Sequence, residues 1–222
     1  MSSIEQVIND TIINFIEEIS LKYGIKKGEL KKLYREKVPD FEKNYNIISS
    51  KDQTKDWRKK QHWYQTGKNN ECELYQKKML QHFLRQPIYK TNFRLNIRTY
   101  EFKEVSTPMK NESGFEWTED FDYTHTYKNI TFFFNLKFVC DAGGAQTRSL
   151  REVYHFITTQ IEYLLFSLNS TICFVNILDG NTSYNNKDKY NYLCNLDKYK
   201  KVRDRVFVGD FLDFISWYQE RF

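Results

Sequence analysis

Residues 130–139 read ITFFFNLKFV, and this almost wholly apolar run is the strongest structural signal in the sequence. Such a run is typical of a central β-strand whose two faces are both buried. After Thr131 near its start, two polar residues interrupt it, Asn135 and Lys137, and their spacing puts them on the same face of the strand. A buried ammonium group is costly unless it is paired or its pKa falls. We therefore expect Lys137 to emerge at a sheet edge or to point into a site.

The segments before this run predict a helix and two more strands. Residues 114–127 alternate in polarity and break at 128–129, which predicts a strand that forms a hairpin with the apolar run. Residues 92–102 (NFRLNIRTYEF) also alternate and predict a further strand with three apolar residues on one face: Phe93, Leu95 and Ile97. A helical pattern covers 71–86 and is stopped by Pro87.

The segments after the run predict a crossover helix and the rest of the sheet. A glycine turn at 141–144 (DAGG) opens a helix over about 147–168, in which Ser149 and Glu152 have the spacing of a capping box. A buried strand, a polar loop, a short strand and a closing helix then follow, at residues 171–178, 181–200, 205–210 and 211–222. This order predicts an α/β (α+β) fold with a central mixed β-sheet flanked by helices.

The first 70 residues predict a helical and basic segment, distinct from a core at 71–222. Isoleucines recur at helical spacing over residues 4–19, and a shorter basic helix follows before Pro39. Aromatic and basic residues alternate over 57–64, a pattern that suits a nucleic-acid backbone and equally suits a loop pinned to the core. A dimerisation element, a DNA-binding arm and a lid on the core all remain open for this segment.

Composition permits a polyanionic partner without requiring one. The chain has 222 residues and a net charge of +5, with basic runs at 22–37, 51–60 and 198–205 that each also suit a solvated face. Its four cysteines show no CxxC spacing, and two of them, Cys140 and Cys173, fall in apolar strand-like runs where we expect them to be buried and reduced. We expect an intracellular, cytoplasmic protein, because no secretion signal or membrane-length apolar run is present.

Spacing also brings a candidate site together. Asp122 precedes Asn135 by 13 residues, and the predicted hairpin folds it back beside Asn135 and Lys137. An acid, an amide oxygen and a lysine at one point of a sheet can hold a hard cation while the lysine orients or activates water. The alternative is a strand whose polar residues simply face solvent.

The stretch AGGAQTRSLRE, residues 142–152, is a second candidate site. Backbone amides at a helix N-terminus attract phosphate, and glycines let the backbone approach closely. We expect this segment to contact DNA phosphates or base edges through six residues: Gly143, Gly144, Gln146, Thr147, Arg148 and Arg151. The alternative is a capped helix start with surface arginines.

Taken together, these features over roughly residues 71–222 resemble the core of PD-(D/E)xK nucleases, and type II restriction endonucleases in particular. The resemblance rests on Asp122, on Asn135-Leu136-Lys137 in a buried strand and on the glycine turn into a helix that starts Gln-Thr-Arg. It extends to the later segments VNILDG and VFVGDFLDFISWY. It implies that Asp122 is the first metal-binding acid, that the Leu136 carbonyl is a further Mg²⁺ ligand and that Lys137 orients the attacking water.

Asn135 departs from the family pattern, which usually has Glu or Asp at that position. An amide oxygen can still coordinate a cation, but it removes one negative charge from the site. A nearby acid would then complete the site, and the candidates are Glu73, Glu116, Glu119, Asp120, Asp141 and Glu152.

The resemblance implies a Mg²⁺-dependent endonuclease that cuts double-stranded DNA at a short palindromic site. We expect such a compact chain to act as a homodimer whose two-fold axis matches that of the DNA site. Two alternatives stay open. One is a non-catalytic nucleic-acid-binding module, which Asn135 motivates, and the other is a structure-specific nuclease of repair or recombination.

Overall fold

The structure is a computed structural model that describes residues 16–30, 58, 71–105, 115–117, 119–140, 143–167 and 171–222. These residues belong to two compact units, with 16–30 in the first and 72–222 in the second. In the first unit, residues 16–23 and 27–30 are helical, as predicted around the break at Gly24. Gly24 has a φ of 67°, the left-handed conformation that commonly ends a helix. The rest of the predicted N-terminal segment, except Arg58, lies outside the described residues.

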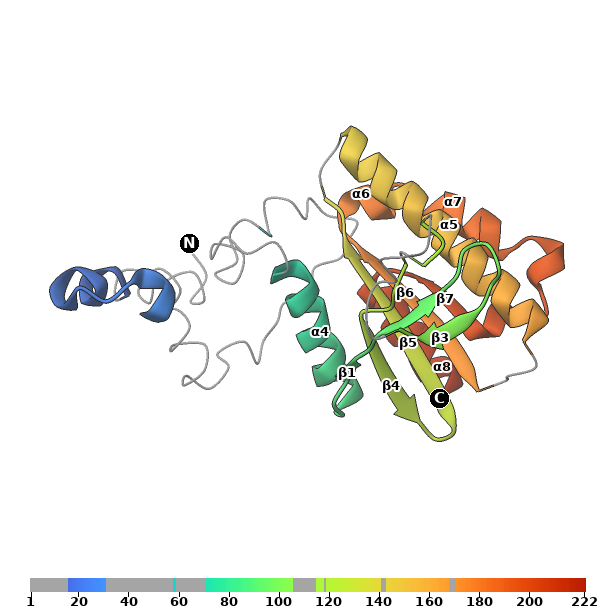
Figure 1. The fold of residues 1–222 in the computed structure, drawn as a ribbon, viewed down its shortest axis with the longest axis horizontal. Coiled ribbons are helices and arrows are strands. Elements are labelled where there is room, and N and C mark those ends of the chain that lie inside the picture. The colour runs from blue at the N-terminus through green and yellow to red at the C-terminus, as the bar shows by residue number, and fades with distance from the viewer. Residues whose placement is uncertain are drawn as a thin grey trace. The chain divides into compact units, whose positions relative to one another are not determined.

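The second unit is built on a five-stranded mixed sheet with the order β1-β4-β5-β6-β7 (Figure 1). The first three of these strands pair antiparallel and the last three pair parallel. Their bounds are Tyr89–Lys90 (β1), Tyr123–Tyr127 (β4), Ile130–Phe138 (β5), Ile172–Asp179 (β6) and Val206–Gly209 (β7). The predicted hairpin is present as β4 and β5, and the predicted α+β fold with a mixed sheet flanked by helices is confirmed.

Helices cover both faces of this sheet. One face packs on α5, where the rings of Phe121 and Phe156 lie 4.9 Å apart. The opposite face packs on α8, where the rings of Phe134 and Phe214 lie 5.9 Å apart, and α4 joins α8 through Phe83. The helices of this unit are Glu71–Leu84 (α4), Gly144–Phe166 (α5), Asn181–Tyr184 (α6), Lys187–Cys194 (α7) and Phe211–Arg221 (α8).

The central strand β5 is buried on both faces, as its sequence predicts. Phe132 and Phe134 are fully buried towards α8, and Phe133 is 4% exposed towards α5. Burial of each such side chain contributes about 1.5–3 kcal/mol of transfer free energy, so this strand anchors the sheet. Because side chains alternate along a strand, Asn135 and Lys137 share the α5 face with Phe133.

The region before β4 differs from the prediction. Residues 92–102 form no single strand, because Phe93–Leu95 (β2) pairs with Phe102–Glu104 (β3) in a separate two-stranded sheet. The side chain of Asn96 ends β2, since its Oδ1 accepts hydrogen bonds from the backbone N–H groups of Arg98 and Thr99, each at 2.8 Å. Among the described residues of 114–127, only Tyr123–Tyr127 form a strand, and Asp120 makes an isolated β-bridge to Arg94.

Two predictions after β5 are wrong. Residues 181–200 are not a loop, because α6, α7 and a 3₁₀ helix at Asp197–Tyr199 occupy them and bury Tyr190, Leu193 and Tyr199. The capping box at Ser149 and Glu152 does not form, because α5 begins earlier, at Gly144, with Gly143 as its N-cap residue. Ser149 and Glu152 therefore lie within the helix.

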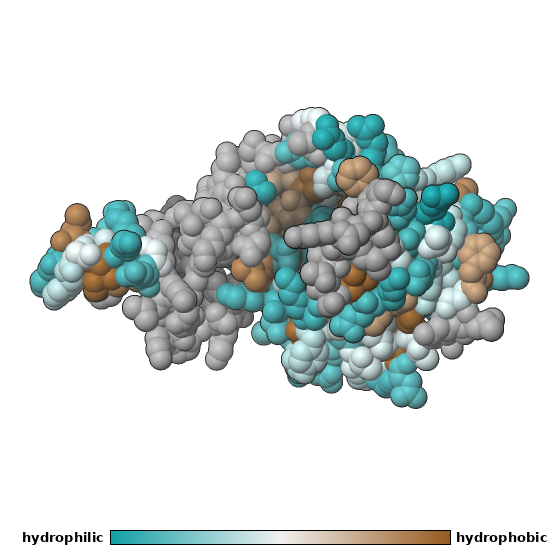
Figure 2. Space-filling view, viewed as in Figure 1, coloured by the Kyte–Doolittle hydropathy of each residue, from teal (hydrophilic) through white to brown (hydrophobic). Residues whose placement is uncertain are grey.

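The surface seen in Figure 2 is largely polar, and the cysteines of the chain are thiols. The face in Figure 2 is mostly hydrophilic, with apolar side chains scattered over it. Within the described ranges, no helix combines the length and apolar character needed to cross a membrane. All four cysteines are free thiols, and Cys140 and Cys173 are buried, as their apolar surroundings predict.

Candidate active site

Asp122 is fixed at the point where β4 and β5 separate. Strand pairing ends at Tyr123 and Phe134, and the backbone N–H of Asp122 donates to the Phe134 carbonyl at 2.8 Å. Its carboxylate then replaces a backbone acceptor of the neighbouring strand: Oδ2 accepts a hydrogen bond from the Leu136 N–H at 2.6 Å. The hairpin thus places Asp122 against the part of β5 that carries Lys137, as the spacing predicts.

The Leu136 carbonyl faces the same open edge of β5. The N–H and C=O of one strand residue point to the same side, and the Leu136 N–H points at Asp122. The neighbouring carbonyl of Lys137 points to the other side, where Gln76 Nε2 of α4 donates to it at 3.1 Å. The Asp122 carboxylate and the Leu136 carbonyl are therefore adjacent oxygen donors, as the resemblance implies for a metal site.

The Asp122 carboxylate is poorly compensated in the protein alone. Its pKa is raised to about 7, mainly by burial and also by the negative charges of Glu73 and Asp120. The Leu136 hydrogen bond and the Lys137 charge lower the pKa without cancelling the effect of burial. A cation beside Asp122 would stabilise its charged form.

Lys137 lies among several carboxylates. Burial raises the pKa of Glu119, the positive charge of Lys137 lowers it, and the negative charge of Glu152 raises it again. These couplings place Glu119 and Asp122 within electrostatic reach of Lys137, and Glu152 within reach of Glu119. Within the described ranges the Lys137 ammonium makes no direct hydrogen bond or salt bridge, so water or a ligand can occupy its donor positions.

The other candidate acids have different environments. Asp120 is bound by Arg94 at 3.2 Å, and Glu73 accepts a hydrogen bond from the Tyr123 hydroxyl at 3.3 Å. The backbone carbonyl of Glu116 accepts a hydrogen bond from Ile97, and Asp141 lies outside the described residues. Glu119 couples to Lys137 and Glu152 couples to Glu119, so we keep these two as candidates for the charge missing at position 135.

Asn135 lies in a buried amide network. Its Nδ2 donates to Asn176 Oδ1 at 3.0 Å, and Asn176 exchanges two hydrogen bonds with Gln160 of α5, at 2.8 and 3.1 Å. Asn135 is 2% exposed, and both partners are fully buried. This placement favours a structural role for Asn135, joining β5, β6 and α5, over the metal-binding role that we expected.

Sequence reasoning did not identify this network. Asn176 was visible as a polar residue in the second buried strand, VNILDG. The parallel register that pairs Asn135 with Asn176 required the three-dimensional structure.

The N-terminal turns of α5 bring most of the predicted DNA-contacting residues together. Gly143, Gly144, Thr147, Arg148 and Arg151 are exposed, and Gln146 is partly buried. In the part of the chain that the structure describes, neither arginine has a hydrogen-bond or ion-pair partner. Their charge is therefore available to an anionic ligand next to Glu152.

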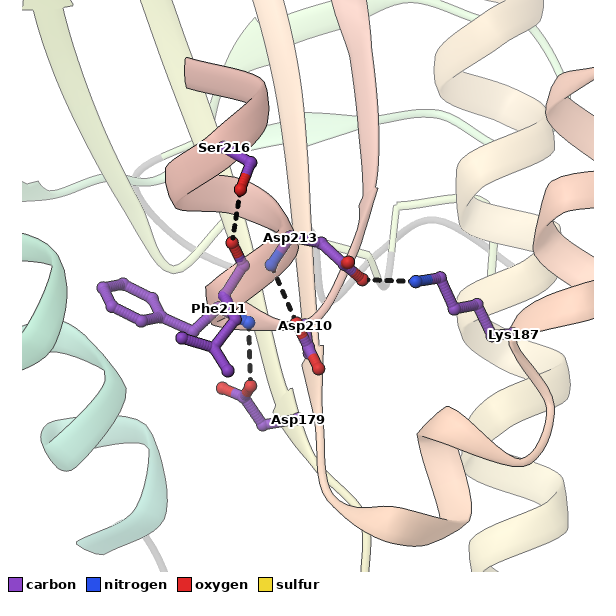
Figure 3. Close-up of polar contacts among 7 residues, drawn as sticks. Asp179, Lys187, Asp210, Phe211, Asp213 and Ser216 are labelled. Carbon is purple, nitrogen blue, oxygen red and sulfur yellow. Dashed lines mark hydrogen bonds and ion pairs between the residues drawn. The ribbon is translucent and has the colours of Figure 1, made fainter. Parts of the chain in front are cut away.

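A second group of acids, at the start of α8, has a structural role (Figure 3). Asp179 Oδ1 accepts from the Phe211 N–H at 3.0 Å, and its Oδ2 accepts from Gln76 at 2.6 Å. Asp210 caps the helix by accepting from the Asp213 N–H at 2.9 Å, and the Asp213 carboxylate pairs with Lys187 at 2.6 Å. Burial raises the pKa of Asp179 to about 6, while the hydrogen bonds from Phe211 and Gln76 lower it. Each of these carboxylates already has a protein partner.

The oxygen donors around Asp122 fit Mg²⁺. Among the described residues, no three His, Cys, Asp or Glu side chains are close enough to hold a metal ion by themselves. Mg²⁺ is commonly held by one or two carboxylates together with waters and substrate phosphates, and it does not need such a cage. Asp122 and the Leu136 carbonyl are adjacent oxygen donors of this kind.

The geometry of the second unit thus joins a poorly compensated carboxylate, a lysine without a salt bridge and a basic helix start. All three lie around one end of β5. Comparisons with known proteins add nothing to this description, because no family model, no curated protein and no solved structure matches the chain.

Proposed function

We propose that the protein is a Mg²⁺-dependent endonuclease that hydrolyses phosphodiester bonds of double-stranded DNA. One observation carries the proposal: the Asp122 carboxylate is held by the Leu136 N–H beside Lys137, and Glu119 couples to the same lysine. An antiparallel hairpin, a crossover helix and a parallel strand surround this point, an arrangement that agrees with a restriction-endonuclease-like core.

The proposed reaction is the attack of water on phosphorus. The water oxygen bonds to phosphorus and loses a proton to solvent, while the opposite P–O bond to the 3′-oxygen breaks. The 3′-oxygen leaves with the electron pair of that bond and takes up a proton from solvent. Mg²⁺, when bound, would offset the negative charge that develops on the phosphate oxygens. Asp122 and the Leu136 carbonyl would hold the ion, and Glu119 or Glu152 would supply the second negative charge.

Lys137 would act on the attacking water and the phosphate. Its ammonium makes no direct salt bridge among the described residues and sits beside carboxylates, so it can donate to a water or to a phosphate oxygen at the same place. Two features would hold it in position: the buried strand β5 and the Asn135–Asn176–Gln160 network below it. Such preorganisation is the main contribution of a protein to this kind of chemistry.

The test is cleavage of supercoiled plasmid DNA with Mg²⁺ and with EDTA. We expect discrete fragments with Mg²⁺ only, and no cleavage by Lys137→Ala or Asp122→Asn although both still bind DNA. Asp197→Asn, which changes an exposed acid far along the chain, is the matched control and should cut normally. Wild-type activity in Lys137→Ala would contradict the proposal.

Two further variants identify the acid that replaces the family carboxylate. If Glu152 completes the metal site, Glu152→Gln should abolish cleavage and Glu119→Gln should reduce it less. If Glu119→Gln lost more activity than Glu152→Gln, Glu119 would be the acid that completes the metal site. Full activity of both variants would remove both acids from the mechanism.

A non-catalytic DNA-binding module is the second candidate, because Asn135 stands where the family has an acid. It predicts tight DNA binding and no cleavage under any Mg²⁺ concentration. Cleavage only of branched or flapped DNA would instead indicate a structure-specific nuclease.

A further inference from the structure

A cavity of about 480 Å³ lies between α5 and α7, which run side by side (Figure 1). Its walls carry three tyrosines, with Tyr154 on α5 and Tyr190 and Tyr192 on α7. The volume falls in the range of pockets that hold small molecules. We call it the α5–α7 cavity.

The tyrosines form a partly rigid aromatic surface. Tyr190 is 3% exposed, and its hydroxyl donates to the Leu150 carbonyl at 3.1 Å, which fixes its ring in the wall. Tyr154 is partly buried, with its ring 6.3 Å from that of Tyr190. Tyr192 is 67% exposed, so the face of its ring is open to a ligand. Aromatic faces of this kind bind flat rings by stacking.

The rim of the cavity carries a small excess of positive charge. Arg151 of α5 and Lys189 of α7 contribute two positive charges, and Asp188 contributes one negative charge. Arg151 has no partner among the described residues, and Lys189 donates to Asn186 Oδ1 at 2.7 Å. An aromatic interior with a cationic rim is complementary to a nucleotide, whose base is flat and whose phosphate is anionic.

The α5–α7 cavity and the candidate active site share one helix. Glu152 couples to Glu119 near Lys137, while its neighbour Arg151 lines the cavity. Successive helix residues point about 100° apart, so Arg151 and Glu152 face different sides of α5, a helix roughly 10–12 Å across with its side chains. A DNA strand held near Lys137 would pass within a few nucleotides of the cavity, since stacked nucleotides rise about 3.4 Å each.

We propose that the α5–α7 cavity takes one unstacked nucleotide of the DNA, with its base against the tyrosines and its phosphate at Arg151 and Lys189. The inference deepens the proposed function and rests on it for the identity of the ligand as DNA. A base can enter only after it leaves the duplex, and this step costs less when the base is already unpaired. The cavity therefore predicts a preference for DNA with an extrahelical base.

The test compares two fluorescein-labelled duplexes of the same sequence, one fully paired and one with a single unpaired thymine. Binding is measured by fluorescence anisotropy in EDTA, where no cleavage occurs. We expect the wild type to bind the bulged duplex about tenfold more tightly, because the unstacking cost has been removed. Tyr192→Ala should lose most of this preference, and Tyr192→Phe should keep it, because stacking needs only the ring.

Controls separate stacking from unfolding. Tyr89→Ala removes a comparably exposed tyrosine, 63% exposed on β1, and should behave as the wild type. Lys189→Ala should weaken binding of the bulged duplex, and its effect should shrink at high salt. Equal affinity of the wild type for the two duplexes, or an unchanged preference in Tyr192→Ala, would overturn the inference.

The outcomes also separate this inference from the proposed function. A preference that depends on Tyr192 in a protein that never cuts plasmid DNA would keep the cavity and remove the nuclease assignment. Cleavage that depends on Lys137, without any preference for the bulged duplex, would keep the nuclease assignment and remove the nucleotide site in the cavity. A protein that binds neither duplex would overturn both.

Discussion

At the scale of single residues, Asp122 shows a conflict between stability and the proposed chemistry. Its carboxylate is partly buried and hydrogen-bonded to the Leu136 N–H, yet burial still raises its pKa to about 7. A group whose pKa is higher in the folded state than in the unfolded chain favours folding at low pH. That contribution is full below the unfolded pKa of about 4 and is lost as the pH rises through 7.

Asp122→Asn should therefore stabilise the protein in mildly alkaline solution. The amide keeps an oxygen that can accept the Leu136 N–H and removes the buried charge, so we expect a gain on the order of 2–4 kcal/mol at pH 8. The gain should vanish below about pH 4, where Asp122 is protonated in both states. Urea unfolding of both proteins at the two pH values measures the difference, and an equal gain at both would show that titration is not its cause.

Mg²⁺ gives a second readout of the same carboxylate that does not depend on cleavage. A ligand that binds only the folded state raises the melting temperature, so Mg²⁺ should stabilise the wild type and have little effect on Asp122→Asn. Asp197→Asn serves as the control, since its side chain is 89% exposed and pairs only with Lys200 among the described residues. The same shift in all three proteins would indicate that the ion binds elsewhere.

At the scale of elements, the buried amide network holds the strand that carries Lys137. Asn176 joins Asn135 on β5 to Gln160 on α5 and also donates to the Phe207 carbonyl on β7 at 3.2 Å. Asn176→Leu would leave buried partners on three elements without hydrogen bonds, and we expect a loss of roughly 2–4 kcal/mol in the free energy of unfolding. Asn191→Leu, at an exposed site on α7, should cost little. Denaturant unfolding compares the two, and equal losses would contradict the structural role of the network.

The start of α5 gives a prediction about DNA binding. Arg148 is exposed and has no partner within the described ranges, so we expect it to contact phosphate and to carry no sequence information. Arg148→Ala should then weaken binding to all duplexes alike and reduce the salt dependence by about one charge. A binding titration on cognate and random duplexes at two salt concentrations measures both quantities. A loss confined to the cognate duplex would show that Arg148 contacts a base instead.

The same elements show what the sequence could predict. The apolar runs identified β5 and β6, because full burial requires them to be apolar on both faces. The spacing of Asp122 and Lys137 predicted their approach, since a hairpin fixes its own register. The split of 92–102 into β2 and β3 depends on the local hydrogen bonds of Asn96, which alternation of polarity does not reveal. The charges of Glu119 and Glu152 couple because α5 packs over the sheet, and local sequence patterns do not predict such packing.

At the scale of the whole molecule, the proposed double-strand cleavage would set a requirement on assembly. Each chain has one candidate active site, counted over the described residues, and each DNA strand needs its own in-line attack. Two chains related by a two-fold axis would present two sites to a palindrome, which is the reason to expect a homodimer. A monomer would have to cut the strands one after the other.

Mixing active and inactive chains distinguishes these cases. Wild type and Lys137→Ala are co-refolded in equal amounts so that mixed dimers form, and supercoiled plasmid is then added with Mg²⁺. A mixed dimer has one working site and should nick one strand, so open-circular plasmid should accumulate beyond the level seen with wild type alone. A functional monomer would give the product pattern of the wild type at a lower rate, because the inactive chains would only compete for DNA. Sedimentation of the wild type with and without a duplex gives the mass of the assembly independently, and a monomer on the DNA would rule out the paired arrangement.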